Sequence, residues 1–225
     1  MDNRILHSTL LFAGIPEEEC DYIYEFVENK TLNKGKALFK TGDECDDFYI
    51  ILKGKLKLVL STIDGRENVV SVIGPKEFLG EVALFDPRPV SVSAIALTTV
   101  EYCTIKYADL RKSLDKHPLV AQNMLKILAH RLRRTDESLS DFAFYDVPGR
   151  VAKSLLSLSE SFGEETSEGL YIQHDLTQEE LSQLVGASRE TVNRVLAEFA
   201  TRGWIRLGIR SVTVVDKEKL KSRTR

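Results

Sequence analysis

The sequence is poor in cysteine and contains no long apolar run. Its three cysteines (Cys20, Cys45 and Cys103) lie far apart without any C-x-x-C pair, and the four histidines lack metal-site spacing. This argues against a zinc site and a redox dithiol. No apolar stretch approaches the roughly 18–20 residues that span a bilayer. The amino-terminal stretch turns acidic too early for a signal peptide. We therefore expect a cytoplasmic protein with no membrane contact and no metal.

The sequence also lacks a large net charge, which is only −3 over 225 residues. That balance argues against a general nucleic-acid-coating protein. The distribution is uneven, however. Residues 160–180 hold seven acidic residues and no lysine or arginine, whereas residues 189–225 hold ten basic residues against four acidic ones. The carboxyl-terminal part is therefore the place to look for contact with DNA.

Residues 175–199, DLTQEELSQLVGASRETVNRVLAEF, predict two short helices joined by a tight turn. Thr177 and Glu180 have the spacing of a capping box. Gly186 suits the left-handed end of the first helix, and Ser188 suits the cap of the second. Buried faces at helical spacing are expected from Leu181, Leu184, Val185, Val192, Val195, Leu196 and Phe199. This pattern is typical of a DNA-binding helix-turn-helix.

The polar face of the second helix carries the groups that would read bases. Arg189 and Arg194 can bridge guanine O6 and N7, and Glu190 can accept from the cytosine amino group. Ser188 and Thr191 are short hydroxyls suited to phosphate. Glu190 and Arg194 are four residues apart and can orient each other, although alone they would be an ordinary surface pair. Thr177 and Gln178 complete the predicted DNA-contacting set.

Residues 31–108 predict a β domain of many short strands broken by glycines. Asp64-Gly65 indicates a hairpin, and the repeated strands favour a small barrel or jelly roll. The segment FLGEVALFD, residues 78–86, predicts a short helix after a glycine, whose free amides favour an anion. Residues 16–28 are expected to form a short amphipathic helix beside the β domain.

A long helix is expected next, from about Ala108 or His117 to Phe142. Apolar residues alternate by four and three along it, as in a two-stranded coiled coil; the alternative is a helix packed on its own domain. Thr135 interrupts this apolar seam with a hydroxyl. The seam consists of Ala121, Leu125, Leu128, Leu132, Thr135, Leu139 and Phe142.

The last part of the chain follows a break at DVPG, residues 146–149, which predicts a hinge. A helix VAKSLLSLSESF should precede the helix-turn-helix, and residues 203–216 should form a β-wing anchored by Trp204. The acidic stretch 159–169 is expected to be a solvated surface loop, or a loop that faces RNA polymerase.

Taken in order, these parts resemble the CRP/FNR transcription regulators, and among them the cyclic AMP receptor proteins. The resemblance covers nearly the whole chain and is strongest at DVPGRVAKSLL and LTQEELSQLVGASRETVNRVL, with support from GEVALFD. It implies an α+β protein with a cyclic-nucleotide-binding-type β jelly roll (residues 1–115), a dimerisation helix (116–145) and a winged helix-turn-helix (146–225). It also implies that Arg189, Glu190 and Arg194 read a TGTGA-like palindrome as a homodimer.

The resemblance places an effector site in the β domain. Gly80, Glu81 and Val82 match the family's phosphate cassette, with Glu81 on a ribose hydroxyl, and Thr135 and Asp136 match the helix positions near the base. The cassette arginine is missing. Alignment on the proline-rich turn puts Val90 at its position and alignment on Ser93-Ala94 puts Val92 there, leaving Ser91 and Ser93 as polar groups. Arg88 is close in the sequence but lies between prolines.

The sequence thus predicts a DNA-binding transcription regulator, with double-stranded DNA, a second copy of the chain and RNA polymerase as partners. The sequence does not identify the effector. The missing arginine argues against cyclic AMP, because a buried phosphate needs a cation. One alternative is a DNA binder with a degenerate pocket that needs no effector, or a different one. Another is a cyclic-nucleotide-binding regulatory subunit of a partner enzyme. No nucleophile elbow, metal-ligand cluster or Walker-type loop suggests an enzyme.

Overall fold

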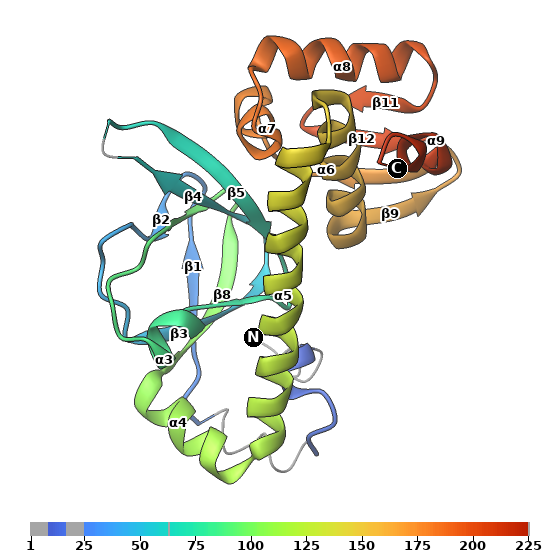
Figure 1. Cartoon of the computed structure of the whole chain (residues 1–225). Coiled ribbons are helices and arrows are strands. Elements are labelled where there is room, and N and C mark those ends of the chain that lie inside the picture. The colour runs from blue at the N-terminus through green and yellow to red at the C-terminus, as the bar shows by residue number, and fades with distance from the viewer. Residues whose placement is uncertain (1–8, 17–24, 63, 225) are drawn as a thin grey trace. The chain divides into compact units, whose positions relative to one another are not determined.

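The computed structural model describes residues 9–16, 25–62 and 64–224. The chain divides into two compact units (Figure 1). The first comprises Met1–Ser61 with Val72–Asp136, and the second comprises Thr62–Ser71 with Glu137–Arg225. The first unit is rich in strands and the second carries the carboxyl-terminal helices. Among the helices in the described ranges, none is long and apolar enough to cross a membrane.

Two four-stranded sheets form the β domain, whose strands belong to the first unit except for most of β5. The first has the order β1 (Glu28–Leu32), β8 (Val100–Lys106), β3 (Asp47–Lys53) and β6 (Phe78–Leu79). The second has the order β2 (Ala37–Phe39), β7 (Ser93–Ala96), β4 (Leu56–Ser61) and β5 (Glu67–Ile73). Neighbours β1–β8, β8–β3, β3–β6, β2–β7 and β7–β4 are antiparallel. The predicted jelly-roll-type β domain is confirmed.

Apolar side chains fill both faces of the first sheet. One cluster lies between the sheets and includes Ile51, Leu56 and Ala94. A second cluster joins Phe48 and Ile50 of β3 to the helical segments on the opposite face. Because β3 is buried on both faces, its sequence is continuously apolar rather than alternating.

Three helices complete the first unit. α3 (Glu81–Phe85) and α4 (Tyr107–Lys116) lie at one end of the β domain, and α5 (Pro118–Phe144) continues into the second unit. The expectation of one helix from about Ala108 is wrong, and the start near His117 is the right one. Proline disfavours helical backbone in the residue before it, so α4 ends at Lys116.

The amino-terminal expectation is only partly testable. Most of the helix expected over residues 16–28 lies outside the described residues, and Glu28 begins strand β1 instead. A 3-10 turn, η1 (Leu10–Phe12), packs Leu11 and Phe12 into the second apolar cluster. Asn123 of α5 donates to the carbonyls of Leu11 and Ala13 at 3.1 and 2.9 Å.

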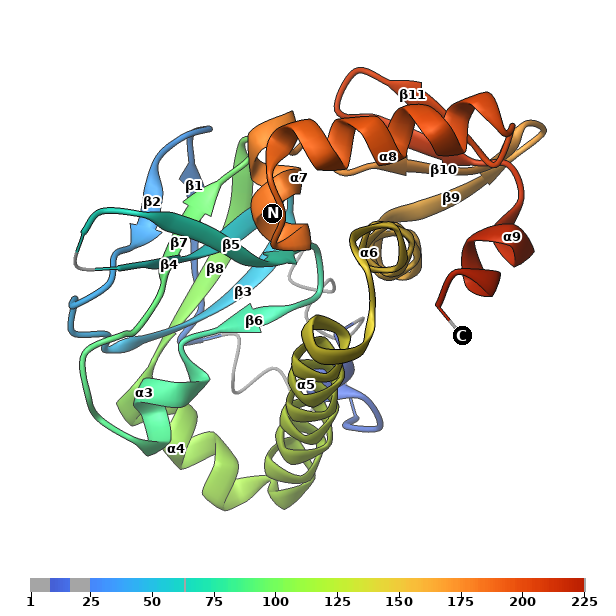
Figure 2. The same cartoon turned by 45° about the horizontal axis from the view of Figure 1, so that its top comes forward.

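The second unit is a four-stranded sheet with four further helices among the described residues. The sheet order is β11 (Ile205–Gly208), β12 (Ser211–Val214), β10 (Gly169–Gln173) and β9 (Gly163–Thr166). The helices are α6 (Val147–Phe162), α7 (Gln178–Val185), α8 (Arg189–Thr201) and α9 (Lys217–Ser222). Figure 2 shows α6 nearly end-on, with α8 passing over it. The predicted break before α6 and the predicted wing β11–β12 are confirmed.

The acidic stretch 159–169 is not the loop that its composition suggested. Its first residues end α6, and residues 163–166 form strand β9, which pairs with β10. Glycine and glutamate have low strand propensity, but the pairing with β10 overrides it. Only the tip of the hairpin, Ser167 and Glu168, remains a turn.

Candidate DNA-binding site and effector pocket

The helix-turn-helix is built from local contacts that its sequence encodes. The Thr177 hydroxyl accepts from the Glu180 amide, and the Glu180 carboxylate accepts from the Thr177 amide, which completes the capping box. Ser188 caps α8 by accepting from the Thr191 amide at 3.3 Å. Between the helices, Gly186 adopts the left-handed conformation with φ 70°. All three local predictions are confirmed.

The buried and exposed faces of α8 separate as expected. Val192, Val195, Leu196 and Phe199 are buried. Arg189, Glu190 and Arg194 are exposed, as are Ser188 and Gln178, while Thr177 and Thr191 are half-buried. The predicted DNA-contacting residues are therefore exposed or half-buried, and they lie at the start of α7 and in the first two turns of α8.

The expected orientation of Glu190 by Arg194 is not seen. The described residues include no ion pair between the two side chains, although Arg202 and Glu198 on the same helix do form one. Exposed pairs gain little free energy in water, so such a pair need not form. Both side chains remain available to an incoming ligand.

The end of α5 supports the turn of the motif. Phe142 packs so closely on Gly186 that a Cβ there would lie 2.3 Å from the Phe142 Cε1. The Arg150 guanidinium lies 5.3 Å from the centre of the Phe142 ring. It also donates to the carbonyls of Val185 and Gly186, both at 3.1 Å. Arg150 thus joins three parts of the second unit around the turn.

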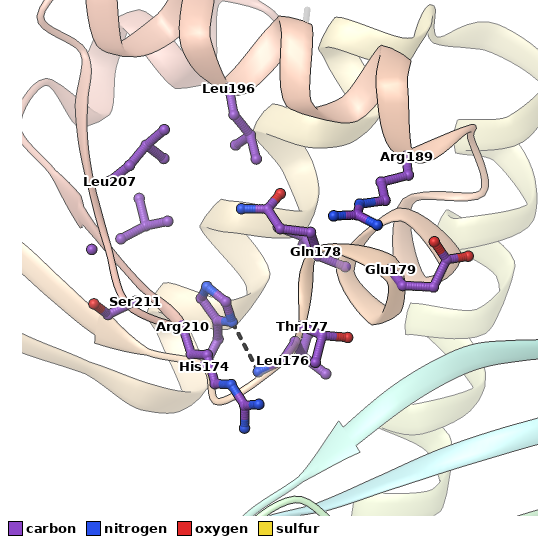
Figure 3. Close-up of a pocket in the computed structure, with 13 residues that line it drawn as sticks. His174, Leu176, Thr177, Gln178, Glu179, Arg189, Leu196, Leu207, Arg210 and Ser211 are labelled. Carbon is purple, nitrogen blue, oxygen red and sulfur yellow. Dashed lines mark hydrogen bonds between the residues drawn. The ribbon is translucent and has the colours of Figure 1, made fainter.

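A cleft of about 350 Å³ lies between the helix-turn-helix and the wing. Figure 3 shows Arg189 on one side, Leu207 on the other, and Gln178 projecting between them. Arg210 of the wing turn also lines it. His174, buried beneath, accepts from the Leu176 amide at 3.1 Å and fixes the chain leading into α7.

The predicted effector residues Gly80 and Glu81 lie at the start of α3. Gly80 has φ 92°, and a Cβ there would lie 2.5 Å from the Asp47 carbonyl oxygen, so only glycine fits. The Tyr107 hydroxyl donates to the Gly80 carbonyl at 2.6 Å. Burial raises the pKa of Tyr107, so this hydroxyl stays protonated as a donor.

Glu81 is buried and paired with a residue of α5. The Arg131 guanidinium donates to Glu81 Oε1 and to the Phe78 carbonyl, both at 2.7 Å. It also lies 4.6 Å from the centre of the Phe78 ring. Burial raises the pKa of the nearby Glu77 carboxyl, against the opposing effects of the Gly74 amide and Arg131. Arg131 thus links the long helix to the β6–α3 turn.

The valines at the missing-arginine position face apolar surroundings. Val90 and Val92 both pack against the cluster between the two sheets. Ser93 accepts from the Thr41 amide at 3.0 Å, and the Thr41 hydroxyl donates to the Ser91 carbonyl at 3.5 Å.

The other predicted effector positions are solvent-facing. Arg88 is exposed and ion-paired with Asp86. Val82 is exposed on α3. Thr135 and Asp136 are exposed on α5, where the Thr135 hydroxyl donates to the Arg131 carbonyl at 3.0 Å. Thr135 therefore lies one helical turn beyond the residue that holds Glu81.

Comparison with known proteins agrees with both halves of the chain. Residues 29–117 match the cyclic nucleotide-binding domain, and residues 149–223 match the Crp-like helix-turn-helix domain. A CRP-like cAMP-activated global transcriptional regulator of Mycobacterium tuberculosis is 42% identical over 99% of this chain and 100% of its own length. The chain belongs to the CRP/FNR family. It is accordingly a DNA-binding transcription regulator.

Solved structures show the same architecture. The catabolite activator protein of Thermus thermophilus is 33% identical with a TM-score of 0.55, covering 96% of this chain and 98% of that one. The c-di-GMP responsive global regulator CLP of Xanthomonas campestris is 25% identical with a TM-score of 0.74, covering 88% and 99%. The relatives of this chain thus include a cAMP-activated regulator and a c-di-GMP responsive one.

Three residues of this CRP/FNR-family chain escaped sequence reasoning. Arg131 precedes Thr135 by one helical turn, and that spacing was the signal that could have identified it. Asn193 lines a hollow with Ser188, Arg189 and Glu190, and its position on the face of Arg189 could have been noticed. Arg150 acts through backbone carbonyls, for which the sequence carries no signal.

No metal centre is evident in the part of the chain that the structure describes. Groups of three or more histidine, cysteine, aspartate or glutamate side chains with ligand geometry are absent from those residues. Cys45 and Cys103 are free and buried, and burial raises the pKa of the Cys103 thiol to about 12.

Proposed function

We propose that this regulator is a homodimer that reads a TGTGA-like palindrome with Arg189, Glu190 and Arg194 of α8. The observation that carries the proposal is the outward projection of these three side chains from a capped and rigidly turned motif. Arginine and glutamate in this arrangement can recognise guanine and cytosine edges. We expect Ser188, Thr191, Thr177 and Gln178 to contact phosphates and fix the register.

The apolar seam of α5 supports the homodimer. Leu125, Leu132 and Leu139 recur every seven residues and all remain exposed in the single chain. Leu128 packs partly against the core of its own domain, so the seam is not wholly free. A second copy would bury the exposed leucines as a coiled-coil pair. It would also place two recognition helices in successive major grooves, about 34 Å apart.

Substitution of Arg189 tests base reading directly. Arg189→Ala should weaken binding to the palindrome by about 1–3 kcal/mol and relax discrimination at one guanine. Binding to scrambled DNA should change little. The measurement is fluorescence anisotropy at fixed salt, since salt sets the affinity. Lys36→Ala, which removes an exposed charge in the β domain, is the control. Equal losses of affinity on both DNAs would reject base reading by Arg189.

A second proposal concerns the effector: DNA binding is not gated by cyclic AMP through the arginine clamp typical of the family. Val90 and Val92 supply no cation and pack in an apolar cluster. The neighbouring arginines are already engaged, Arg88 with Asp86 and Arg131 with Glu81. A cyclic phosphate placed there would be desolvated without a paired charge. Either no effector or a different one then controls the regulator.

Restoring the arginine tests this second proposal. By calorimetry, the wild type should show no micromolar binding of cyclic AMP. In Val90→Arg the binding free energy for cyclic AMP should improve by about 1.5–3 kcal/mol, because the new guanidinium forms charge-assisted hydrogen bonds with the phosphate. Val92→Arg is the matched variant, and whichever gains affinity identifies the arginine position. Micromolar binding of cyclic AMP by wild type that raises operator affinity would contradict the proposal.

We propose RNA polymerase as the protein partner, because the family acts in transcription. We also propose that the protein works in the cytoplasm, where the DNA lies, and that it catalyses no reaction. A cyclic-nucleotide-binding subunit of an enzyme remains the outcome to consider if no sequence-specific DNA footprint is found.

A further inference from the structure

The tip of the wing is unusually apolar. β11 and β12 are joined by the two-residue turn Ile209-Arg210. Such turns ordinarily carry glycine, asparagine or aspartate. Here Ile209 is 91% exposed, and Leu207 beside it is 48% exposed. Two large apolar side chains so exposed at one turn are available to contact another molecule.

The turn is held firmly against the helix-turn-helix. The Arg210 carbonyl accepts from the amides of His174 and Asp175 at 3.2 and 3.0 Å, directly before the Thr177 cap. It also accepts from the side-chain Nε2 of Gln173 at 3.3 Å. Arg210 itself adopts a positive φ of 53°. The wing tip is therefore positioned by the same segment that begins α7.

The wing and the recognition helix border one concave surface. Leu207 and Arg210 line the same cleft as Gln178 and Arg189, as Figure 3 shows. If α8 occupies a major groove, we expect the adjoining sugar–phosphate strand to pass this cleft, with the minor groove beyond it.

The charges of the wing favour this occupant. Arg206 is ion-paired with Glu168 across the sheet. The guanidinium of Arg210, in contrast, forms no ion pair with any of the described residues. An arginine and an isoleucine projecting together combine a cation with an apolar surface. Minor-groove contacts in DNA use this combination, since cations follow the negative potential of narrow A·T-rich segments and apolar side chains pack on sugars and base steps.

We propose that the wing tip, Leu207 to Arg210, enters the DNA minor groove next to the half-site and makes A·T-rich flanks a specificity determinant. Arg210 lies in the groove, and Ile209 packs against deoxyribose. This proposal rests on the proposed function, because it requires α8 in the neighbouring major groove. The wing then adds sequence preference at base pairs that α8 does not reach.

Inosine substitution separates minor-groove from major-groove reading. Three palindromes share the TGTGA core but carry A·T, G·C or inosine·C pairs in the blocks on either side of it. An inosine·C pair presents the major groove of G·C but lacks the guanine amino group in the minor groove. Binding of the full-length chain to the TGTGA core is first measured with and without cyclic AMP. The three palindromes are then compared in the condition that gives the tighter binding. We expect A·T and inosine·C flanks to bind similarly, and G·C flanks about fivefold or more weakly.

Two variants assign the preference to the wing. Ile209→Ser and Arg210→Asn should each reduce the flank preference while keeping the penalty for substitutions in the core. Asparagine tolerates the positive φ at position 210, and Ile209 is too exposed to support the fold. Val215→Ser, an exposed apolar residue after β12, is the matched control and should keep the preference.

The outcomes are distinguishable from failure of the proposed function. If inosine·C flanks rank with G·C, if flanks have no effect, or if both wing variants keep the wild-type preference, the wing proposal is overturned while core recognition stands. If the wild type does not distinguish the TGTGA core from scrambled DNA, the proposed function itself fails.

Discussion

Arg131 places a full positive charge beside a carboxylate that is almost inaccessible to solvent. The side chain of Glu81 is 8% exposed and that of Arg131 is 25% exposed. Removal of one member of such a pair leaves the other desolvated without a partner, which costs more than the pair itself contributes. The Phe78 ring and carbonyl hold the guanidinium in the geometry that Glu81 needs.

Arg131→Met should therefore lower the free energy of unfolding by about 1.5–3 kcal/mol, since a hydrogen bond to a charged group is lost. Urea unfolding of the full chain measures this. Arg133→Met on the same helix, where the side chain is exposed, should change stability by no more than about 0.5 kcal/mol. In a double-mutant cycle, Arg131→Met should cost less when Glu81 is already glutamine. Equal costs in the two backgrounds would contradict the pairing.

At the scale of elements, the turn between α7 and α8 depends on the end of α5. Gly186 needs both a positive φ and an empty Cβ position, because Phe142 lies against it. Arg150 bridges the Phe142 ring and the last carbonyls of α7. The angle between the two helices of the motif is thus fixed partly by α5.

A pair of glycine substitutions separates these two requirements. Gly203 has φ 73° but open space around its Cβ position. Gly203→Ala should lower the free energy of unfolding by about 1 kcal/mol, because alanine is strained in the left-handed conformation. Gly186→Ala should lower the free energy of unfolding by about 1–3 kcal/mol more than Gly203→Ala does, because Phe142 must move. Thermal unfolding compares them, and equal losses would show that the Phe142 contact does not constrain the turn.

How much the sequence reveals differs between elements for a physical reason. Caps and turns of the helix-turn-helix join residues three or four apart, so Thr177, Gly186 and Ser188 could be predicted individually. The Glu81–Arg131 pair joins residues fifty positions apart, which no local pattern encodes. Strand β9 was missed because its stability comes from pairing with β10 rather than from its own residues. Pro118 could have marked the boundary between α4 and α5.

At the scale of the whole molecule, the proposed homodimer would use the exposed row of leucines along α5, Leu125, Leu132 and Leu139. Leu139→Asp would place a charge within the proposed seam, near its carboxyl-terminal end, so light scattering should show a monomer at concentrations where wild type is a dimer. The neighbouring Ser140→Asp introduces the same side chain on the exposed face outside the seam and should leave the mass unchanged. A dimeric Leu139→Asp protein would exclude this seam as the interface.

The junction between α5 and α6 is short, and it contacts the residues that follow α9. The Tyr145 hydroxyl donates to the Thr224 carbonyl at 2.8 Å, and the Tyr145 carbonyl accepts from Arg150. Arg223 lies 3.6 Å from the Asp146 carboxylate. These contacts tie the start of α6 to the residues that follow α9, and bending at the joint would strain them. The joint is therefore stabilised by a hydrogen bond between residues 79 positions apart in the sequence.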